Sequence, residues 1–144
     1  MKALPDGCAK NMVAVDTNIV VRLIVHDDEK QWQAVCRLFQ GVEQEGRRIF
    51  LSYVVVLETF WVLEKTYRNT RDGILSALEI LHKLPIIEWE SKTLMDRFLQ
   101  LALTDKVDLS DLLIALVAEE HGCVKCLTFD KAAARQPYFE MLKS

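Results

Sequence analysis

Glycine and proline are scarce in this sequence, with only 5 and 3 among 144 residues. Such a composition excludes collagen-like and low-complexity chains and disfavours the many turns of an all-β protein. An excess of positive charge is also lacking, because 18 Lys and Arg residues face 21 Asp and Glu residues, for a net charge of −3. The chain therefore has no overall basic surface for nucleic acid, and binding to phosphates would need local patches or metal ions.

Long apolar runs and dense cysteines are lacking too. No stretch reaches the roughly 20 apolar residues that cross a bilayer, since Arg22 interrupts the run Ile19–Val25. The N-terminal segment has no apolar signal-peptide core. Four cysteines make no dense disulfide framework. We therefore expect a reduced, cytoplasmic protein with no membrane association.

What the sequence contains is an alternation of short apolar strands and amphipathic helices. Residues 1–12 are polar and aperiodic and are expected to be a flexible N-terminal extension, followed by one domain over 13–144. Strands are predicted at 13–15, 49–51, 86–89, 124–129 and 139–142. Helices are predicted at 19–26, 29–45, 53–67, 70–84, 92–104, 109–121 and 132–136. This order indicates an α/β fold of three layers, with helices on a central, mostly parallel sheet of about five strands.

Two aspartates follow predicted strands directly. Asp16 comes after the first strand and Asp130 after the fourth. The carboxyl ends of parallel strands are where ligands gather, so both residues are candidates for a functional site. Taken alone, each also fits an ordinary turn or helix N-cap, because Asp favours both.

Glu58 is the third candidate, on the helix predicted over 53–67. Its helical neighbours three and four residues away are Val54, Val55, Trp61 and Val62, all apolar, so Glu58 is expected to point from the buried face. A buried carboxylate is costly unless it is paired or binds a metal. The alternative is a buried salt bridge, but no basic residue lies within one helical turn.

Asp108 and Asp111 lie at the start of the helix predicted over 109–121. Asp108 fits the N-cap, and Asp111 fits the acidic third position of a capping box. Ile114 and Ala115, three and four residues later, place Asp111 on an apolar face of the helix. A residue that only capped the helix would be expected at the rim instead. Asp108 is therefore interpreted as the cap and Asp111 as the site residue.

Acids so arranged suggest one shared pocket. Clustered carboxylates repel one another, and a divalent cation relieves that repulsion. Oxygen ligands suit Mg²⁺ or Mn²⁺, whereas zinc would need a His or Cys cluster that the sequence lacks. Such sites commonly serve phosphoryl chemistry.

Four segments, in this order, resemble the PIN-domain family, and within it the VapC-type ribonuclease toxins. They are Val15–Asn18, Leu57–Leu63, Asp108–Ala115 and Leu127–Lys131. The resemblance covers 13–142. It implies a metal-dependent endoribonuclease that hydrolyses RNA phosphodiester bonds, with tRNA as a candidate substrate. It also implies the toxin of a toxin–antitoxin system, a homodimer held inactive by an antitoxin protein that inserts a segment near the acidic site.

The resemblance also implies the site residues. The four acids of the family match Asp16, Glu58, Asp111 and Asp130. In the resulting hypothesis, Asp16 and Asp111 are the core metal ligands, Asp130 completes the site, and Glu58 holds a second metal or orients water. Small polar positions that shape the pocket match Thr17, Asn18 and Thr128, and Asp108 is a supporting residue.

Two basic residues and one cysteine pair complete the candidates. Lys131 and Arg135 follow Asp130 and are candidates for contacts to the RNA backbone. Cys123 and Cys126 form a Cys-x-x-Cys motif on a strand predicted to be buried, where their side chains would point to opposite faces. They are therefore interpreted as structural.

Three other functions remain open. One is a phosphoacceptor or phosphatase domain that uses an Asp as nucleophile with a Lys partner such as Lys131. Another is a non-catalytic interaction module that kept the fold. The third is a DNA nuclease of the flap type, which usually has a larger chain with more acids.

Overall fold

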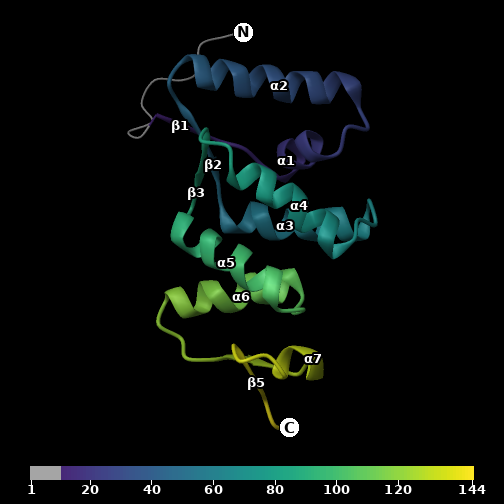
Figure 1. Cartoon of the computed structure of the whole chain (residues 1–144), viewed down its shortest axis with the longest axis vertical. Helices are drawn as coiled ribbons and strands as arrows, with labels where there is room; N and C mark the ends of the chain where they lie inside the picture. Colours follow the sequence, from purple (N-terminus) through teal and green to yellow (C-terminus); the bar gives the residue numbers. More distant parts are fainter. Residues whose placement is uncertain (1–10) are drawn as a thin grey trace. The chain divides into compact units, whose positions relative to one another are not determined.

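The computed structural model describes residues 11–144, in which seven helices and five strands group into two units (Figure 1). The division falls between Glu90 and Ser91. Residues 1–10 of the predicted extension lie outside the described residues, and Met12 already belongs to the first strand. No helix within residues 11–144 is both long and apolar enough to cross a membrane.

The first unit contains a parallel sheet of three strands in the order β1-β2-β3. Its elements are β1 (Met12–Ala14), α1 (Thr17–Ile24), α2 (Glu29–Gln44), β2 (Arg48–Leu51), α3 (Tyr53–Lys65), α4 (Arg71–His82) and β3 (Ile87–Trp89). The register pairs Val13 with Ile49 and Ile49 with Ile87. Two helices connect each of these strands to the next, which gives the long crossover that neighbouring parallel strands need.

The second unit contains a parallel pair of strands, β4-β5. Its elements are α5 (Lys92–Thr104), α6 (Leu109–Glu120), β4 (Cys126–Thr128), α7 (Lys131–Ala134) and β5 (Phe139–Met141). Helix α7 makes the crossover, and the register pairs Cys126 with Phe139 and Thr128 with Met141.

The predicted α/β class is confirmed. All five predicted strands are present, and every pairing is parallel. Three of them form the sheet of the first unit and two form the sheet of the second. The strand predicted over 124–129 is shorter, because only residues 126–128 pair with β5.

Short polar side chains at the helix starts set the helix boundaries. The predicted caps Ser52, Ser91 and Asp108 are confirmed, each accepting a hydrogen bond from the backbone N–H three residues later at 3.0–3.2 Å. These bonds satisfy N–H groups that the helix itself leaves unpaired. Gly46, with φ of +66°, follows the end of α2 as predicted, in a conformation that favours glycine.

Each unit has its own buried apolar residues. The most deeply buried large side chains include Ile49, Phe60 and Leu63 in the first unit and Phe98 and Leu112 in the second. Burying each one stabilises the fold by roughly 1.5–3 kcal/mol. Helix α3 buries one stripe and helix α6 another, and these stripes determine which faces carry Glu58 and Asp111.

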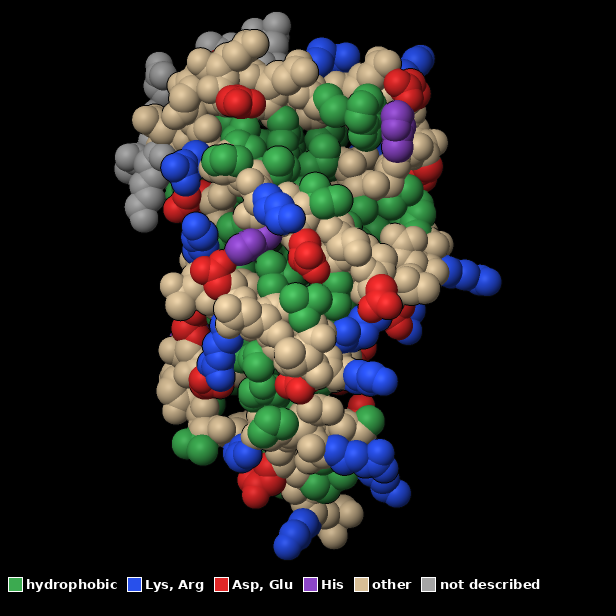
Figure 2. All heavy atoms as spheres, in the orientation of Figure 1, with side chains coloured by type: hydrophobic (Ala, Val, Ile, Leu, Met, Phe, Trp, Pro, Cys, Tyr) green, Lys and Arg blue, Asp and Glu red, His purple; other side chains and the backbone are tan. Residues whose placement is uncertain are grey.

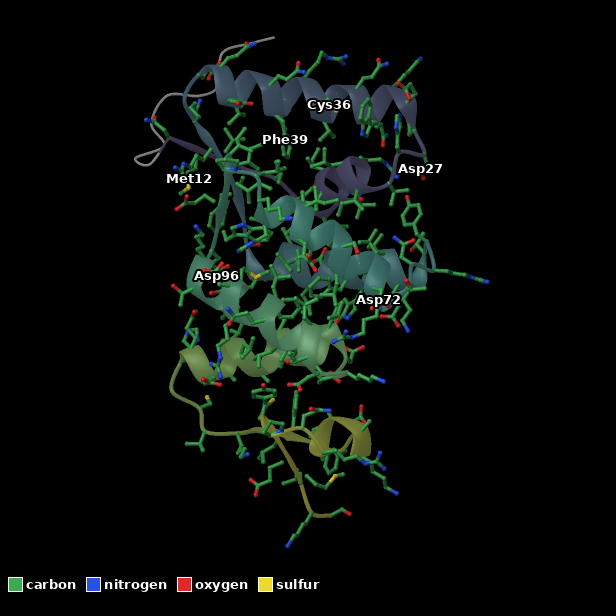
Figure 3. The ribbon with its side chains drawn as sticks, in the orientation of Figure 1. Met12, Asp27, Cys36, Phe39, Asp72 and Asp96 are labelled. Atoms are coloured by element: carbon green, nitrogen blue, oxygen red, sulfur yellow. The ribbon has the colours of Figure 1, made fainter. Side chains whose placement is uncertain are left out.

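Helix α2 also turns an apolar side inward. Cys36 and Phe39 lie on the side of α2 that faces the rest of the first unit (Figure 3). Val35 and Val42 are buried on the same helix. Cys36 is half-buried on this side of the helix.

Candidate functional site

Asp16 lies in the first unit, where the chain leaves β1 and enters α1. It is the N-cap of α1, and its Oδ1 accepts a hydrogen bond from the N–H of Ile19 at 3.2 Å. The positive end of the helix dipole favours a charged carboxylate at this position. The side chain is exposed, and within residues 11–144 its Oδ2 accepts no hydrogen bond. Capping therefore uses one oxygen of Asp16, and the second oxygen faces solvent.

Thr17 follows Asp16 in the sequence and contacts Glu58. Its buried hydroxyl donates a hydrogen bond to Oε2 of Glu58 at 2.8 Å, across 41 residues of sequence. This bond connects the first turn of α1 to the middle of α3, two helices that pack together. Glu58 thus lies against the residue that follows Asp16, so two of the four predicted acids belong to adjacent elements of the first unit.

The predicted burial of Glu58 is wrong, because its side chain is exposed. Helix α3 buries Val56, Thr59, Phe60 and Leu63 instead. The neighbours of Glu58 face outward with it: Val54 is 63% and Trp61 48% exposed. The reason is that α3 is apolar on nearly every side, so apolar neighbours did not identify the buried face. What singles out Glu58 is its bond to Thr17.

Asn18 is exposed and lines a groove between α1 and α2. The groove has a volume of about 330 Å³, with Ile19, Val35 and Leu38 as apolar lining and Gln31 and Arg22 as polar lining. The groove therefore has both polar and apolar lining residues, and Asn18 among them lies two positions after Asp16 in the sequence.

Arg22 is a residue of this groove that the sequence analysis did not select. Its guanidinium donates hydrogen bonds to the Tyr67 hydroxyl at 2.7 Å and to Oδ1 of Asp27 at 3.0 Å. Asp27 lies in the connection between α1 and α2 (Figure 3). The bond to Tyr67, followed by the charge of Asp27, raises the pKa of Arg22, so the guanidinium stays charged. The signal in the sequence was an arginine inside an otherwise apolar helix.

Asp108 and Asp111 lie in the second unit at the start of α6. Asp108 is the N-cap, as predicted, and its Oδ1 accepts the N–H of Asp111 at 3.0 Å. Asp108 is exposed, whereas Asp111 is half-buried. Leu112, Leu113 and the rest of the buried stripe of α6 hold Asp111 at the edge of the packed face.

Asp130 follows β4 in the same unit. Its backbone N–H donates a hydrogen bond to Thr128 Oγ1 at 3.0 Å. Its Oδ1 accepts the N–H of Ala132 at 2.9 Å and caps α7. Asp130 therefore caps the helix that follows its strand, as Asp16 does. A cap occupies one carboxylate oxygen and leaves the other for a ligand.

Asp111 is the electrostatic centre of the second unit's acids. Burial raises its pKa, and the negative charges of Asp108 and Asp130 raise it further. The pKa of Asp111 thus responds to two other carboxylates, one at the start of α6 and one at the start of α7. The second unit therefore concentrates negative charge around one half-buried acid.

This donor chemistry fits a hard divalent cation. The candidate donors are carboxylate oxygens with nearby hydroxyls, which suits Mg²⁺ or Mn²⁺ rather than zinc. Positive charge placed there would relieve the repulsion around Asp111. Within residues 11–144 no group of three or more His, Cys, Asp or Glu side chains is arranged so that it could hold a metal ion.

The basic candidates lie next to Asp130. Lys131 is the first residue of α7 and Arg135 is its C-cap, and both side chains are exposed. On the face seen in Figure 2, Lys and Arg side chains alternate with Asp and Glu. Charge on that face is thus mixed, as the net charge of −3 predicts.

The interpretation of the cysteine pair as part of a buried strand is wrong. Cys123 is exposed and precedes β4, while Cys126 is half-buried and begins it. The strand itself is not buried, and its central residue Leu127 is 58% exposed. The prediction failed because a short apolar run cannot distinguish a buried strand from one that is half-buried on one face and exposed on the other.

A known protein family matches most of this chain. Residues 13–137 match the PIN domain, which spans most of the chain and includes all four candidate acids. None of the curated proteins compared with the chain matches it. PIN domains are generally metal-dependent nucleases, and therefore hydrolases. The chain belongs to the PIN domain family.

Proposed function

We propose that this protein is a metal-dependent endoribonuclease that hydrolyses RNA phosphodiester bonds with Mg²⁺ or Mn²⁺. The observation that carries the proposal is the half-buried Asp111, whose charge is opposed by Asp108 and Asp130. A divalent cation bound beside these carboxylates would relieve the repulsion that Asp111 experiences. Membership of a family of nucleases supplies the reaction class.

Asp16 and Asp111 would be the principal metal ligands. Asp130 would complete the donor set directly or through water, and Glu58 would hold a second ion or orient the attacking water. When bound, the metal supplies Lewis-acid charge at the scissile phosphate and acidifies a water molecule. Thr17 has a positioning role, because its hydroxyl fixes the rotamer of Glu58 through the 2.8 Å bond.

Lys131 and Arg135 would hold the RNA backbone beside Asp130. Both are exposed, Lys131 at the start and Arg135 at the end of α7, so their charges are available to phosphates. Contacts of this kind bind any sequence and weaken with salt. They would therefore orient the strand, and recognition of a particular RNA would rest on other contacts.

The experiment that tests the activity compares two aspartates with the same local role. Asp16 and Asp28 are both exposed N-caps in the first unit, with Oδ1 bonded at 3.2 and 3.0 Å. Asn caps helices as well as Asp does, so Asp16→Asn and Asp28→Asn should both fold normally. Purified protein is incubated with a total tRNA pool and Mg²⁺ or Mn²⁺, with and without EDTA.

We expect discrete fragments with wild type and Asp28→Asn in the presence of metal. We expect none with Asp16→Asn, and none with EDTA. Full activity of Asp16→Asn would refute its role, and equal loss in both variants would indicate a general effect on α1 and α2. A trapped phosphoenzyme would favour the phosphoacceptor alternative, and absence of Mn²⁺ binding by calorimetry would favour a non-catalytic module.

The toxin role is part of the same proposal. It rests on the resemblance of the four acidic segments to VapC-type toxins, which act in the cytoplasm as homodimers restrained by an antitoxin. The groove lined by Asn18 has a volume of about 330 Å³ and would bind the inserted antitoxin segment. Arg22 would contact a polar group of that segment and Leu38 an apolar one.

The toxin role has its own test. Induced expression in a bacterial host should arrest growth with wild type and with Asp28→Asn, but not with Asp16→Asn. Light scattering of the purified chain should give twice its mass of 16.6 kDa. Growth that continues under wild-type expression, with cleavage intact in vitro, would separate the nuclease from the toxin role.

A further inference from the structure

Two free thiols lie on the surface of the second unit, three residues apart. Cys123 is exposed and Cys126 is half-buried, and neither is in a disulfide. Neither cysteine belongs to the proposed nuclease site. Because β4 is not buried, burial does not account for a Cys-x-x-Cys pair at this position.

The backbone is held at both ends of this pair. Gly122, with φ of +89°, ends α6, and the N–H of Cys123 then donates to the carbonyl of Ala118 at 3.0 Å. This bond and that from Gly122 to Glu119 are those of a Schellman cap. At the other end, the N–H of Cys126 donates to the carbonyl of Tyr138 at 2.9 Å as β4 begins.

Only Val124 and Lys125 lie between these two fixed points. The chain bends at Val124, whose side chain is 90% exposed and so contributes almost no packing. A disulfide needs Cα atoms about 4.4–6.8 Å apart, and three consecutive residues span at most about 11 Å when fully extended. Both residues of this bent connection are exposed, so no packed side chain stands in the way of an approach of the two thiols.

We propose that Cys123 and Cys126 form a reversible intramolecular disulfide, with a hydroperoxide as the oxidant. The exposed Cys123 thiolate attacks the peroxide oxygen, giving a sulfenic acid and releasing water or an alcohol. The Cys126 thiol then displaces hydroxide from that sulfur, which leaves as a second water. Overall, the two thiols lose two electrons and two protons, and the peroxide O–O bond is reduced.

The location of the pair gives the disulfide a structural consequence. The connection it would shorten joins α6, which carries Asp108 and Asp111, to β4, which leads to Thr128 and Asp130. A disulfide would restrict the movement of this connection and of the start of β4. The proposal itself does not require nuclease activity, since its tests read thiols and backbone rather than cleavage.

The first test uses the full chain with Cys8→Ser and Cys36→Ser, so that only the pair can react. Hydrogen peroxide is added at pH about 8.5, where an ordinary thiol is half ionised. We expect both titratable thiols to disappear from the monomer, with a mass decrease of two hydrogen atoms and full reversal by dithiothreitol. In the matched Cys126→Ser variant, Cys123 should instead gain oxygen or link two chains.

Three results would overturn the proposal. They are retention of both thiols, addition of oxygen without loss of hydrogen, and disulfides found only between chains. A second measurement tests the structural consequence: hydrogen exchange over 124–128 should slow on oxidation and recover on reduction. Unchanged exchange in a chain with the disulfide formed would refute the coupling to β4, and the Cys123→Ser, Cys126→Ser double variant should show no response to peroxide.

Discussion

The hydrogen bond from Thr17 to Glu58 is the contact that most directly connects two elements of the candidate site. Thr17→Val removes the hydroxyl and keeps nearly the same volume, so the change isolates the bond at a buried position. Glu58→Ala removes the acceptor from an exposed position on α3. The two substitutions and their combination form a double-mutant cycle that measures their interaction.

The expected interaction energy follows from the geometry. A hydrogen bond to a charged group contributes roughly 1.5–3 kcal/mol when it is shielded from water. Thr17 is buried but Glu58 is exposed, so water can replace the lost partner of the carboxylate and reduces the value to about 1 kcal/mol. For a chain of this size that corresponds to a fall in Tm of about 2–4 °C for Thr17→Val.

Urea unfolding of the four proteins gives the interaction energy, and Mn²⁺ titration gives its effect on metal binding. Thr59→Val is the matched control, because Thr59 is a buried threonine of α3 whose hydroxyl donates to the carbonyl of Val55 at 2.7 Å. We expect Thr17→Val to weaken Mn²⁺ binding and Thr59→Val to leave it unchanged. An interaction energy below about 0.3 kcal/mol would refute the reasoning that this bond holds Glu58 in place.

Three further predictions test other parts of the structure. Burial and nearby acids raise the pKa of Asp111, so ionising this carboxyl costs more in the folded than in the unfolded protein. The folded protein therefore loses stability as pH rises above the ordinary pKa of an Asp. Asp111→Asn should be more stable than wild type at pH 7 but not below about pH 4. Equal unfolding free energies at pH 7 would contradict this, and Mn²⁺ affinity should fall in the same variant. Phe98→Ala removes a fully buried ring and should cost about 3–5 kcal/mol of unfolding free energy, whereas a loss below 1 kcal/mol would contradict its place in the core. Lys131→Gln and Arg135→Gln should each reduce the salt slope of RNA binding by about 1, measured by fluorescence anisotropy, and unchanged slopes would remove them from the RNA contact.

The order of helices and strands followed from local signals in the sequence. Ser52, Ser91 and Asp108 marked helix starts because short polar side chains bond the free N–H groups of the first turn. Gly46 marked a helix end because its backbone adopts φ of +66°. These interactions involve residues within a few positions of one another, so they could be predicted without knowledge of the tertiary structure.

Which helix face is buried could be predicted only in part. Helix α3 is apolar on almost every side, so its sequence pattern could not show that Phe60 turns inward while Glu58 and Trp61 turn outward. The same limit applied to β4, whose apolar residues were taken for a buried strand. Burial depends on what packs against an element, and that is decided by residues distant in sequence.

The sequence by itself thus determined the α/β class, the parallel strands and the candidate acids, because capping, turn and periodicity signals act over a few residues. Tertiary structure decided which of those residues meet. It brought Thr17 to Glu58 across 41 positions and set Asp130 near enough to Asp111 to raise its pKa. It also left Cys123 and Cys126 at the surface. Contacts of this kind arise when whole helices and strands pack, and their energies depend on distances that no local pattern encodes.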